Sequence, residues 1–304
     1  MTSRSIAIIG LVALVTSVAG SCSKPAPQPA AQSAFDSPAQ AGAALFEAVQ
    51  KDDQPALLVL FGPNGKELIW SGDAAADRES RERFVDRYRK MHRIGFDSEN
   101  RTALIIGAEN WPFPIPLTNA GGKWRYDTDA GKSEVLYRRI GRNEMRAIAT
   151  CEELAAAQKE YFSKPHDGQP AHEYAQHMVS SSGKHDGLFW ESTTDTEDSP
   201  IGTLLAFAGA EATAKEAHEG RAPFHGYFYR LLKSDGTTSF IIDGKMTRGF
   251  AFIAYPAEYR SSGVMTFLVG PDGVVYQKDL GADGMSQAAE LTGIALDRSW
   301  QPVR

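Results

Sequence analysis

The sequence lacks the usual signatures of catalysis and of nucleotide binding. It contains no G-x-S-x-G, C-x-x-C, G-x-G-x-x-G or phosphate-loop pattern, which argues against the common serine hydrolases, dithiol enzymes and nucleotide-binding proteins. No basic block is present and the formal net charge is −6, so nucleic acid is not an expected partner. The sequence also shows no EF-hand spacing, and we predict neither a metal site nor a cofactor.

Cysteine is scarce, with Cys22 and Cys151 the only two in 304 residues. If Cys22 carries a lipid, Cys151 remains a single thiol; if Cys22 is unmodified, the two could form a disulfide in an oxidising compartment. Cys151 follows Met145 and Ile148 at the spacing of one helix face, which favours a small core residue over a reactive thiol.

Long apolar runs are absent except near the start of the chain. Arg4 is the only charge before residue 24, an apolar run covers residues 6–15, and the small residues Ala19-Gly20-Ser21 follow. A charged start, a short apolar run and a small-residue end are typical of a secretory signal peptide, here residues 1–21. The run is too short for a bilayer span, which needs about 20 residues.

Cys22 stands directly after the small triplet, where a lipobox cysteine would receive its acyl chains. Ala19 occupies the position where a lipobox usually has Leu, so ordinary cleavage and a soluble periplasmic protein is the alternative. Ser23 is not acidic, which favours the outer over the inner membrane. We therefore expect a protein on the periplasmic side of the outer membrane, held there by a lipid on Cys22.

Residues 22–36 are rich in Pro, Ala and Gln and predict an extended tether after the anchor. Two α+β domains are expected beyond it, at residues 37–140 and 141–304. The first should contain helices packed on a curved antiparallel sheet. The second should contain a long helix followed by an antiparallel meander.

In the first domain, Ser37-Pro38 is a good helix start, and further helices are expected at residues 53–61 and 73–92. A strand at residues 102–106 and a hairpin with its turn at residues 119–122 complete the pattern.

The segment from Trp111 to Leu117 alternates apolar residues with three prolines. In a strand, these prolines would remove three amide donors along one edge, so we predict an edge strand protected from further pairing. An aromatic-proline groove that binds a ligand through Trp111 is the alternative.

In the second domain, a helix is predicted at residues 142–162, followed by a loop-rich stretch with helical segments near residues 172–179 and 199–217. The chain then reads as short strands, with a hairpin turn at residues 271–273 between the last two. The strands are expected at residues 224–232, 239–242, 249–255, 264–269 and 274–278.

His172 and His177 resemble the zinc-protease pair but are five residues apart. On a helix, that spacing separates the two imidazoles by about 140°, whereas both must reach one metal ion. We therefore expect no zinc site here.

The loop around His185 and Asp186 is a candidate working site, because an adjacent carboxylate could orient a histidine general base. The alternative is a turn that places Phe189 and Trp190 in the core. On the strand at residues 224–230, His225, Tyr227 and Tyr229 would share one face. That face could bind a ligand or glycan, or could be a second packed face of a buried strand.

Eight ordered segments together resemble the bacterial exported-protein family catalogued as domain of unknown function 2950, over nearly all of residues 35–302. They are residues 111–116, 122–128, 138–144, 173–176, 184–190, 224–230, 262–267 and 273–280. The resemblance implies no known activity. The chain departs from the family pattern in a short loop between Leu232 and Phe240. It also has fewer acidic residues around His166-Asp167-Gly168, which argues against a cation site in that loop.

Two architectural likenesses accompany this one. Residues 37–127 resemble the helices and curved sheet of nuclear-transport-factor-like proteins, and residues 142–280 resemble the soluble part of a pilin. Neither implies a function.

These observations favour a non-catalytic envelope lipoprotein that binds or assembles a protein or cell-wall partner. An envelope hydrolase is the alternative. It would require His185, Asp186, His225 and Tyr227 to converge on one pocket.

Overall fold

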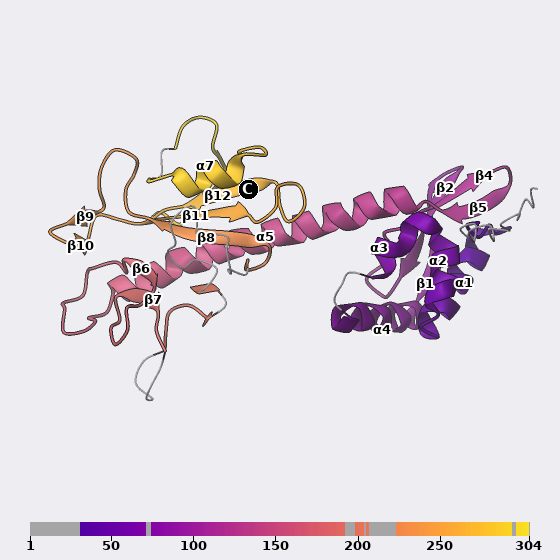
Figure 1. Ribbon diagram of the computed structural model, residues 1–304, viewed down its shortest axis with the longest axis horizontal. Coiled ribbons are helices and arrows are strands. Elements are labelled where there is room, and N and C mark those ends of the chain that lie inside the picture. Colours follow the sequence, from indigo (N-terminus) through magenta and orange to yellow (C-terminus); the bar gives the residue numbers. More distant parts are fainter. Residues whose placement is uncertain are drawn as a thin grey trace, which may run out of the picture. The chain divides into compact units, whose positions relative to one another are not determined.

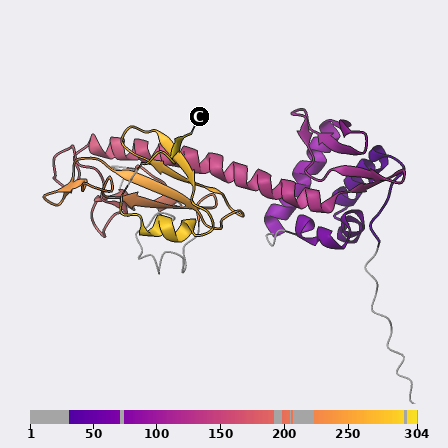
Figure 2. The ribbon, with the colours of Figure 1, turned by 90° about the horizontal axis from the view of Figure 1, so that it is seen from above.

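The computed structural model of the chain is shown in Figures 1 and 2. It describes residues 31–70, 74–191, 198–203, 205–206, 223–293 and 296–303. The predicted signal peptide and Cys22 lie outside these ranges. The chain divides into two compact units, the first ending at Thr128 and the second beginning at Asp129, with the short segment Pro114–Pro116 belonging to the second.

The helices of the first unit begin and end where local sequence dictates. Helix α1 (Pro38–Gln50) is capped by Ser37, whose hydroxyl accepts a hydrogen bond from the amide of Gln40. Asp53 caps α2 (Gln54–Phe61), which ends at Gly62 with a left-handed φ of 73°. A 3₁₀ turn, η1 (Pro63–Gly65), and the short helix α3 (Lys66–Ile69) lead to α4 (Ala74–Lys90). The three predicted helices are therefore confirmed.

The sheet of the first unit is antiparallel and packs against α1. Its order is β1 (His92–Ser98), β2 (Arg101–Ile106), β4 (Leu117–Ala120) and β5 (Lys123–Tyr126), and β3 (Trp111–Pro112) also pairs with β2. Gly121 and Gly122 form the predicted β4–β5 turn, with φ of 62° and 78° as a two-residue type I′ turn requires. The buried hydroxyl of Tyr126 donates to the carbonyl of Ala41 and ties the sheet to α1.

The prediction of one edge strand over residues 111–117 is wrong. Only Trp111 and Pro112 pair with β2, and the amide of Phe113 donates to the carbonyl of Leu104 at 2.7 Å. The chain then leaves the ladder at residues 114–116 and returns as β4. Prolines cannot donate to a ladder, and here they break the strand in two. Strand β1 was also not foreseen, since the sequence pattern predicts helix as far as residue 92.

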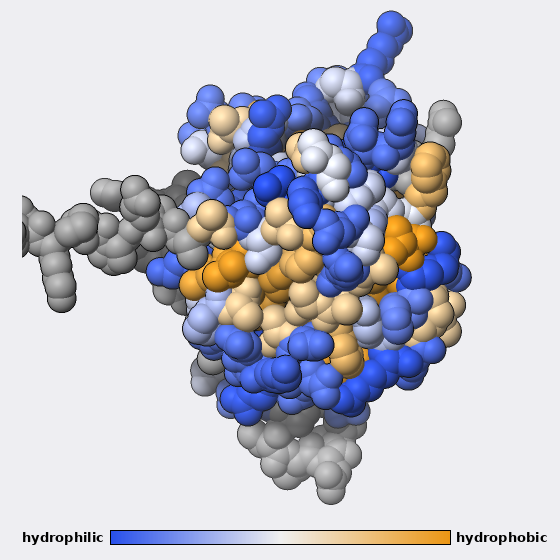
Figure 3. All heavy atoms as spheres, turned by 90° about the vertical axis from the view of Figure 1, so that its right-hand side faces the viewer, coloured by the Kyte–Doolittle hydropathy of each residue, from blue (hydrophilic) through white to orange (hydrophobic). Residues whose placement is uncertain are grey.

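Figure 3 shows the first unit from the right-hand side of Figure 1. Apolar side chains gather at the centre of this face and hydrophilic ones surround them. Elsewhere in the unit, Phe96 on β1 is 88% exposed. A single exposed apolar side chain is common on protein surfaces, whereas a contiguous apolar patch can mark a surface that contacts a partner.

The helix of the second unit, α5, spans Thr128–Phe162. The prediction that it begins at residue 142 is wrong, although its end at Phe162 is confirmed. Asp129 lies in the first turn, where a carboxylate stabilises the helix dipole, and Gly141 is accommodated inside the helix. The domain boundary predicted near residue 140 falls inside α5 and stays a prediction.

The antiparallel meander of the second unit confirms the α+β prediction. Its order is β8 (Tyr227–Leu232), β11 (Ala251–Pro256), β12 (Met265–Val269), β13 (Val275–Asp279) and β14 (Gln301–Pro302). The β9–β10 hairpin (Ile241–Ile242, Lys245–Met246) is inserted between β8 and β11, and α7 (Gly284–Glu290) follows β13. The predicted turn at residues 271–273 joins β12 to β13, with Gly273 at a φ of 78°.

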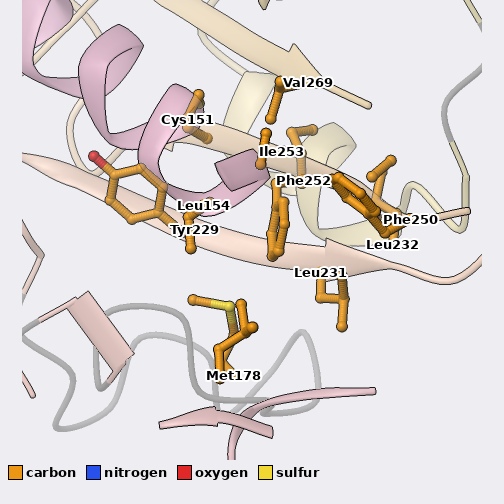
Figure 4. Close-up of a cluster of buried hydrophobic side chains, with 14 of the residues drawn as sticks. Cys151, Leu154, Met178, Tyr229, Leu231, Leu232, Phe250, Phe252, Ile253 and Val269 are labelled. Carbon is orange, nitrogen blue, oxygen red and sulfur yellow. The ribbon is translucent and has the colours of Figure 1, made fainter. Parts of the chain in front are cut away.

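The core of the second unit lies between α5 and this sheet (Figure 4). Cys151 and Leu154 on α5 are fully buried, as are Phe252 and Ile253 on β11. Burial raises the pKa of the Cys151 thiol, which therefore stays protonated. The predicted role of Cys151 as a small core residue is confirmed.

The stretch after α5 is extended rather than helical, so the helix predicted near residues 172–179 is wrong. It contains β6 (His177–Val179), which pairs in parallel with β7 (Gly187–Phe189). Most of the helix predicted at residues 199–217 lies outside the described residues. No helix in the described ranges is both long enough and apolar enough to cross a membrane.

Polar side chains of α5 hold the loop that leads into β12. The Oε1 atom of Glu144 accepts hydrogen bonds from the amides of Val264 and Met265 at 2.9 and 3.0 Å. The amide group of Asn143 donates to the carbonyl of Ser262 at 2.8 Å. These contacts fix the start of a central strand to the helix.

We predict that Glu144→Ala destabilises the protein by about 1–3 kcal/mol, because two partly buried amides lose their acceptor. Glu134→Ala, on the same helix, should cost no more than about 0.5 kcal/mol, since Glu134 is partly exposed and forms an i,i+4 ion pair with Arg138. Urea unfolding of both variants measures the difference. Equal losses would show that Glu144 does not hold the loop.

Candidate functional site

Two His-Asp-Gly tripeptides, residues 166–168 and 185–187, pack against each other in the second unit. Both carboxylate oxygens of Asp167 are engaged by His185. Oδ1 lies 2.7 Å from the ring Nδ1, and Oδ2 accepts the backbone amide at 2.6 Å. The carboxylate of the first tripeptide thus orients the histidine of the second.

Each tripeptide needs its glycine for a different physical reason. Asp167 and Gly168 have left-handed φ values of 48° and 75°, and the amide of Gln169 donates to the carbonyl of His166, which closes a tight turn. Gly187 is extended, but a Cβ there would lie 2.6 Å from the amide nitrogen of Ser180. The turn and the close approach bring the two segments within hydrogen-bonding distance.

The orienting carboxylate predicted from the sequence, Asp186, is not the one found. Its Oδ1 accepts the amide of Ser181 at 2.7 Å and closes its own loop. Burial raises its pKa, but the hydrogen bonds from Ser181, with the charges of His177 and Lys184, outweigh this and lower the pKa overall. Adjacent residues in an extended segment point to opposite sides, which explains why Asp186 does not face the ring of His185.

The pKa of the Asp167 carboxyl is also lowered, first by the hydrogen bond from the His185 amide and then by the His185 ring. Asp167 is therefore ionised at neutral pH. A carboxylate at Nδ1 favours the ring tautomer with a proton on Nδ1, which leaves Nε2 as an acceptor.

Tyr161, on the last turn of α5, supports both histidines. Its hydroxyl donates to the carbonyl of His185 at 2.5 Å. Its ring stacks on His166 with centroids 3.8 Å apart. Trp190 meets the His185 ring edge to face at 4.7 Å.

His166 is nine-tenths buried in this arrangement, with 9% of its surface exposed. Its Nε2 lies 3.0 Å from the carbonyl oxygen of Tyr161 and must donate to it, since a carbonyl cannot. In the neutral ring, Nδ1 is then an acceptor, and it is buried without a hydrogen-bond partner.

These residues line a cavity of about 100 Å³. The side chains that form its wall combine aromatic rings with carboxylates. They include Tyr161, His166, Asp167, Glu173, Tyr174 and Asp186. A second, larger hollow, lined by Phe189, Trp190 and the loop at residues 180–184, shares His185 with the first.

The segment that carries Glu173 and Tyr174 is fixed to α5 by Gln158. The buried Gln158 side chain both donates to the carbonyl of Ala175 and accepts its amide, each at 2.9 Å. Glu173 forms an ion pair with Lys245 of the β9–β10 hairpin. These contacts fix the position of the segment that carries Glu173 and Tyr174.

His172 and His177 lie on this extended segment, not on a helix. His172 packs edge to face on Phe162 at 5.3 Å, and His177 begins β6. Within the ranges that the structure describes, no group of three His, Cys, Asp or Glu side chains is placed to hold a metal ion.

His225 does not share a strand face with Tyr227 and Tyr229, so that prediction is wrong. His225 and Gly226 have left-handed φ values of 54° and 79° and form a two-residue turn, and β8 begins only at Tyr227. The turn breaks the alternation on which the prediction rested. Tyr227 and Tyr229 on one face of β8 are fully buried, and Phe228 on the other face is buried too. Strand β8 therefore has two packed faces and presents neither tyrosine to a ligand.

His185 and His225 lie at separate places along α5. His225 Nδ1 is 3.4 Å from the guanidinium of Arg146, whereas His185 is held by Tyr161. These two helix positions are fifteen residues apart, which is roughly 22 Å along the helix axis. Burial and the Arg146 charge lower the pKa of His225, which is therefore neutral at neutral pH. The hydrolase arrangement of His185, Asp186, His225 and Tyr227 is not formed.

Trp111, the other predicted binding residue, lies in the first unit. The guanidinium of Arg87 sits 5.3 Å from its ring centroid, and Phe113 meets it edge to face at 6.4 Å. Trp111 is half-buried by these neighbours.

Asp167, His166 and Tyr161 were missed by sequence reasoning. The repeated His-Asp-Gly tripeptide marks both segments in the sequence, although only the first copy forms a turn. Sequence alone does not say which carboxylate faces which ring.

We predict that Asp167→Ala removes the preference of His185 for the Nδ1-protonated tautomer, because its acceptor is lost. Ring nitrogen chemical shifts, measured by NMR at mildly alkaline pH, report the tautomer. Asp186→Ala is the matched control and should leave it unchanged. A tautomer that responds to Asp186 and not to Asp167 would contradict the pairing.

We predict that lowering the pH breaks the hydrogen bonds of the Asp167 and Asp186 carboxylates over a defined pH range. Both carboxyls have a folded pKa below the ordinary value of 3.8, so their hydrogen bonds are fully formed above that pH and are lost as the pH falls through the lower folded values. The amide resonances of His185 and Ser181 should therefore titrate with midpoints below 3.8. In Asp167→Asn, the His185 amide should no longer titrate while the Ser181 amide still does. Midpoints above 3.8 would contradict the assignment.

A family model described as a protein of unknown function, DUF2950, matches residues 32–303. No curated protein and no solved structure matches the chain. The likenesses to a pilin and to nuclear-transport-factor-like proteins therefore stay predictions. The family resemblance carried by the eight sequence segments is confirmed, and the chain belongs to the DUF2950 family.

Proposed function

We propose that this chain is an exported lipoprotein on the periplasmic side of the outer membrane, where it binds or assembles a partner without catalysing a reaction. The motivation for the export step is the charged start, the apolar run at residues 6–15 and the small residues before Cys22. Acylation of Cys22 would supply the anchor, since several acyl chains hold a protein stably in a bilayer.

The observation that carries the proposal is where the fold begins. The side chain of Gln32 donates to the carbonyls of Leu60 and Tyr126 at 3.0 and 2.7 Å, and the amide of Ser33 donates to the carbonyl of Val59 at 2.8 Å. The family match also begins at residue 32. Residues 23–31 lie between Cys22 and Gln32 in the sequence, and a proline-rich segment of that length could span roughly 28 Å.

A binding role is favoured over catalysis because the residues predicted from the sequence to be catalytic do not come together in one site. Tyr227 and Tyr229 are core residues, and His225 and His185 are held at different places along α5. The apolar centre of the face in Figure 3 offers a surface of the kind that contacts a protein partner. An envelope protein or a cell-wall component is the expected partner.

An envelope hydrolase is the second candidate, and the Asp167–His185 pair is the observation that favours it. A histidine oriented by a carboxylate beside an open hollow has the geometry of a general base. Its nucleophile would have to come from water. Hydrolysis of an envelope substrate that is lost in His185→Ala would favour this candidate.

Cys22→Ala should abolish incorporation of radiolabelled fatty acid and move the protein from the membrane fraction to the soluble periplasm. Cys151→Ala is the matched control, since the Cys151 thiol is buried and should not be acylated. Labelling that persists in Cys22→Ala, or a cytoplasmic location of the unchanged chain, would contradict the proposal.

The binding role is tested separately by crosslinking in intact cells. The anchored chain should yield a reproducible crosslinked envelope partner. Absence of any crosslink across growth conditions would overturn the binding role while leaving the anchoring result intact.

A further inference from the structure

We infer that four exposed arginines of the second unit bind the phosphate groups of an anionic phospholipid surface. They are Arg139, Arg142 and Arg146 on α5 and Arg260 in the loop that precedes β12, and we term them the arginine patch. The inference rests on the proposed location at a membrane. It goes beyond that proposal because it names a second contact with lipid, separate from the acyl chains on Cys22.

The helix and a neighbouring loop bring these arginines to one face. Positions 139, 142 and 146 lie within about 60° of each other around α5, at 100° per residue. Arg139 donates to the carbonyl oxygen of Ser261 at 3.1 Å and so holds the loop of Arg260 beside this face. The sequence shows no basic block because these arginines are interleaved with other residues and come from two distant segments.

None of the four arginines pairs with a carboxylate among the residues that the structure describes. Arg139 contacts a backbone carbonyl and a hydroxyl, and Arg146 contacts the ring of His225, which is neutral at neutral pH. The guanidinium of Arg260 lies 5.4 Å from the ring centroid of Tyr259. These contacts orient the guanidinium groups but do not neutralise their charge.

The carboxylates near the arginine patch leave it positive. Glu144 already accepts hydrogen bonds from two backbone amides at the start of β12. Glu258 lies in the loop of Arg260, and Glu153 lies seven residues beyond Arg146, roughly 10 Å along the helix. At that distance an exposed charge is strongly screened. The patch therefore keeps an excess of positive charge on a chain whose formal net charge is −6.

The chemistry of arginine suits phosphate. A guanidinium donates two parallel N–H bonds to the oxygens of one phosphate and stays charged at any physiological pH. The arginines of α5 are spread along roughly 10 Å of the helix instead of surrounding one point. Each can therefore meet a different phosphate, which favours a surface of many headgroups over a single small anion.

Exposed apolar side chains beside the arginines favour lipid over an acidic protein. Val135, one turn before Arg139, is 40% exposed, and Met145, next to Arg146, is 65% exposed. At a bilayer surface, arginines meet the phosphates while neighbouring apolar groups enter the boundary of the acyl region. An acidic protein surface would satisfy the charges but would leave these apolar groups without a matching environment.

The test is cosedimentation of the purified mature chain carrying Cys22→Ala, which has no acyl group, with lipid vesicles. We expect binding to vesicles of equal parts phosphatidylcholine and phosphatidylglycerol, and none to phosphatidylcholine alone. Because the attraction is electrostatic, binding should weaken when the salt concentration is raised several-fold. Equal binding to both kinds of vesicle, or no binding to the anionic one, would overturn the inference.

Two soluble probes distinguish a lipid surface from other anions. Millimolar glycerol phosphate should not displace the chain from anionic vesicles, and displacement would indicate a site for free phosphate and overturn the surface. Poly-L-glutamate should bind far more weakly than the vesicles. Binding of equal strength would show that an acidic polypeptide suffices and would overturn the assignment to lipid.

Variants locate the surface. The double variant Arg142→Glu with Arg146→Glu should weaken binding to anionic vesicles at least tenfold, and Arg142→Gln alone, a milder change, should weaken it several-fold. Arg298→Glu, at an exposed arginine in the same unit, is the matched control and should bind like the unchanged chain. Met145→Ser should weaken vesicle binding several-fold if the apolar contact is made. Loss in Arg298→Glu, or none in the other variants, would refute the arginine patch.

The two membrane contacts fail separately in these experiments. The vesicle assay uses a chain without acyl groups, so a negative result refutes the arginine patch and leaves the anchor on Cys22 untouched. The fatty-acid labelling of the unchanged chain does not depend on the arginines, so a negative result there refutes the anchor alone.

Discussion

Burial of one face of α5 against the antiparallel sheet is the interaction on which the second unit depends. The helix contributes Cys151 and Leu154, and the sheet contributes Phe252 and its neighbours, all withdrawn from water. Apolar burial of this kind stabilises a fold by roughly 25 cal/mol per Å² and has no directional preference. It therefore fixes the helix on the sheet, but it does not specify the path of the irregular segments between them.

The irregular segments are held in place by hydrogen bonds from polar side chains at three positions along α5. Glu144 holds the amides that precede β12, Gln158 holds both backbone groups of Ala175, and Tyr161 holds the carbonyl of His185. A buried backbone N–H or C=O group outside a helix or sheet still needs a hydrogen-bond partner, and here the side chains of α5 supply it. The last two of these contacts position the segments of the candidate site, so its geometry depends on α5.

Much of the fold could be predicted because it depends on local chemistry. Ser37 and Asp53 as helix caps, Gly121-Gly122 as a hairpin turn and the short apolar strands of the meander are each readable over a few residues. Predictions failed where two local signals conflicted and the sequence alone did not show which one decides. Residues 111–117 alternate like a strand, yet the prolines break the ladder, and Gly141 looks like a helix break but lies inside α5.

The candidate site was predicted only in part. His185 was identified, because a histidine between glycines and aromatics is visible locally, but its carboxylate partner was assigned to the neighbouring residue. The true partner, Asp167, lies 18 residues away and is brought there by a turn and a close backbone approach. Residues 224–230 failed similarly, since the left-handed turn at His225 is not encoded in the alternation.

The crosswise arrangement of the two His-Asp-Gly tripeptides has a consequence for how the chain can evolve. Asp167 serves the histidine of the other tripeptide, whereas Asp186 serves only its own loop. The two copies thus have the same sequence, but only the aspartate of the first is required to hold a histidine. Among relatives, positions 167 and 185 should change together, and a lineage that lost one would be released from keeping the other. Position 186 should vary independently of both.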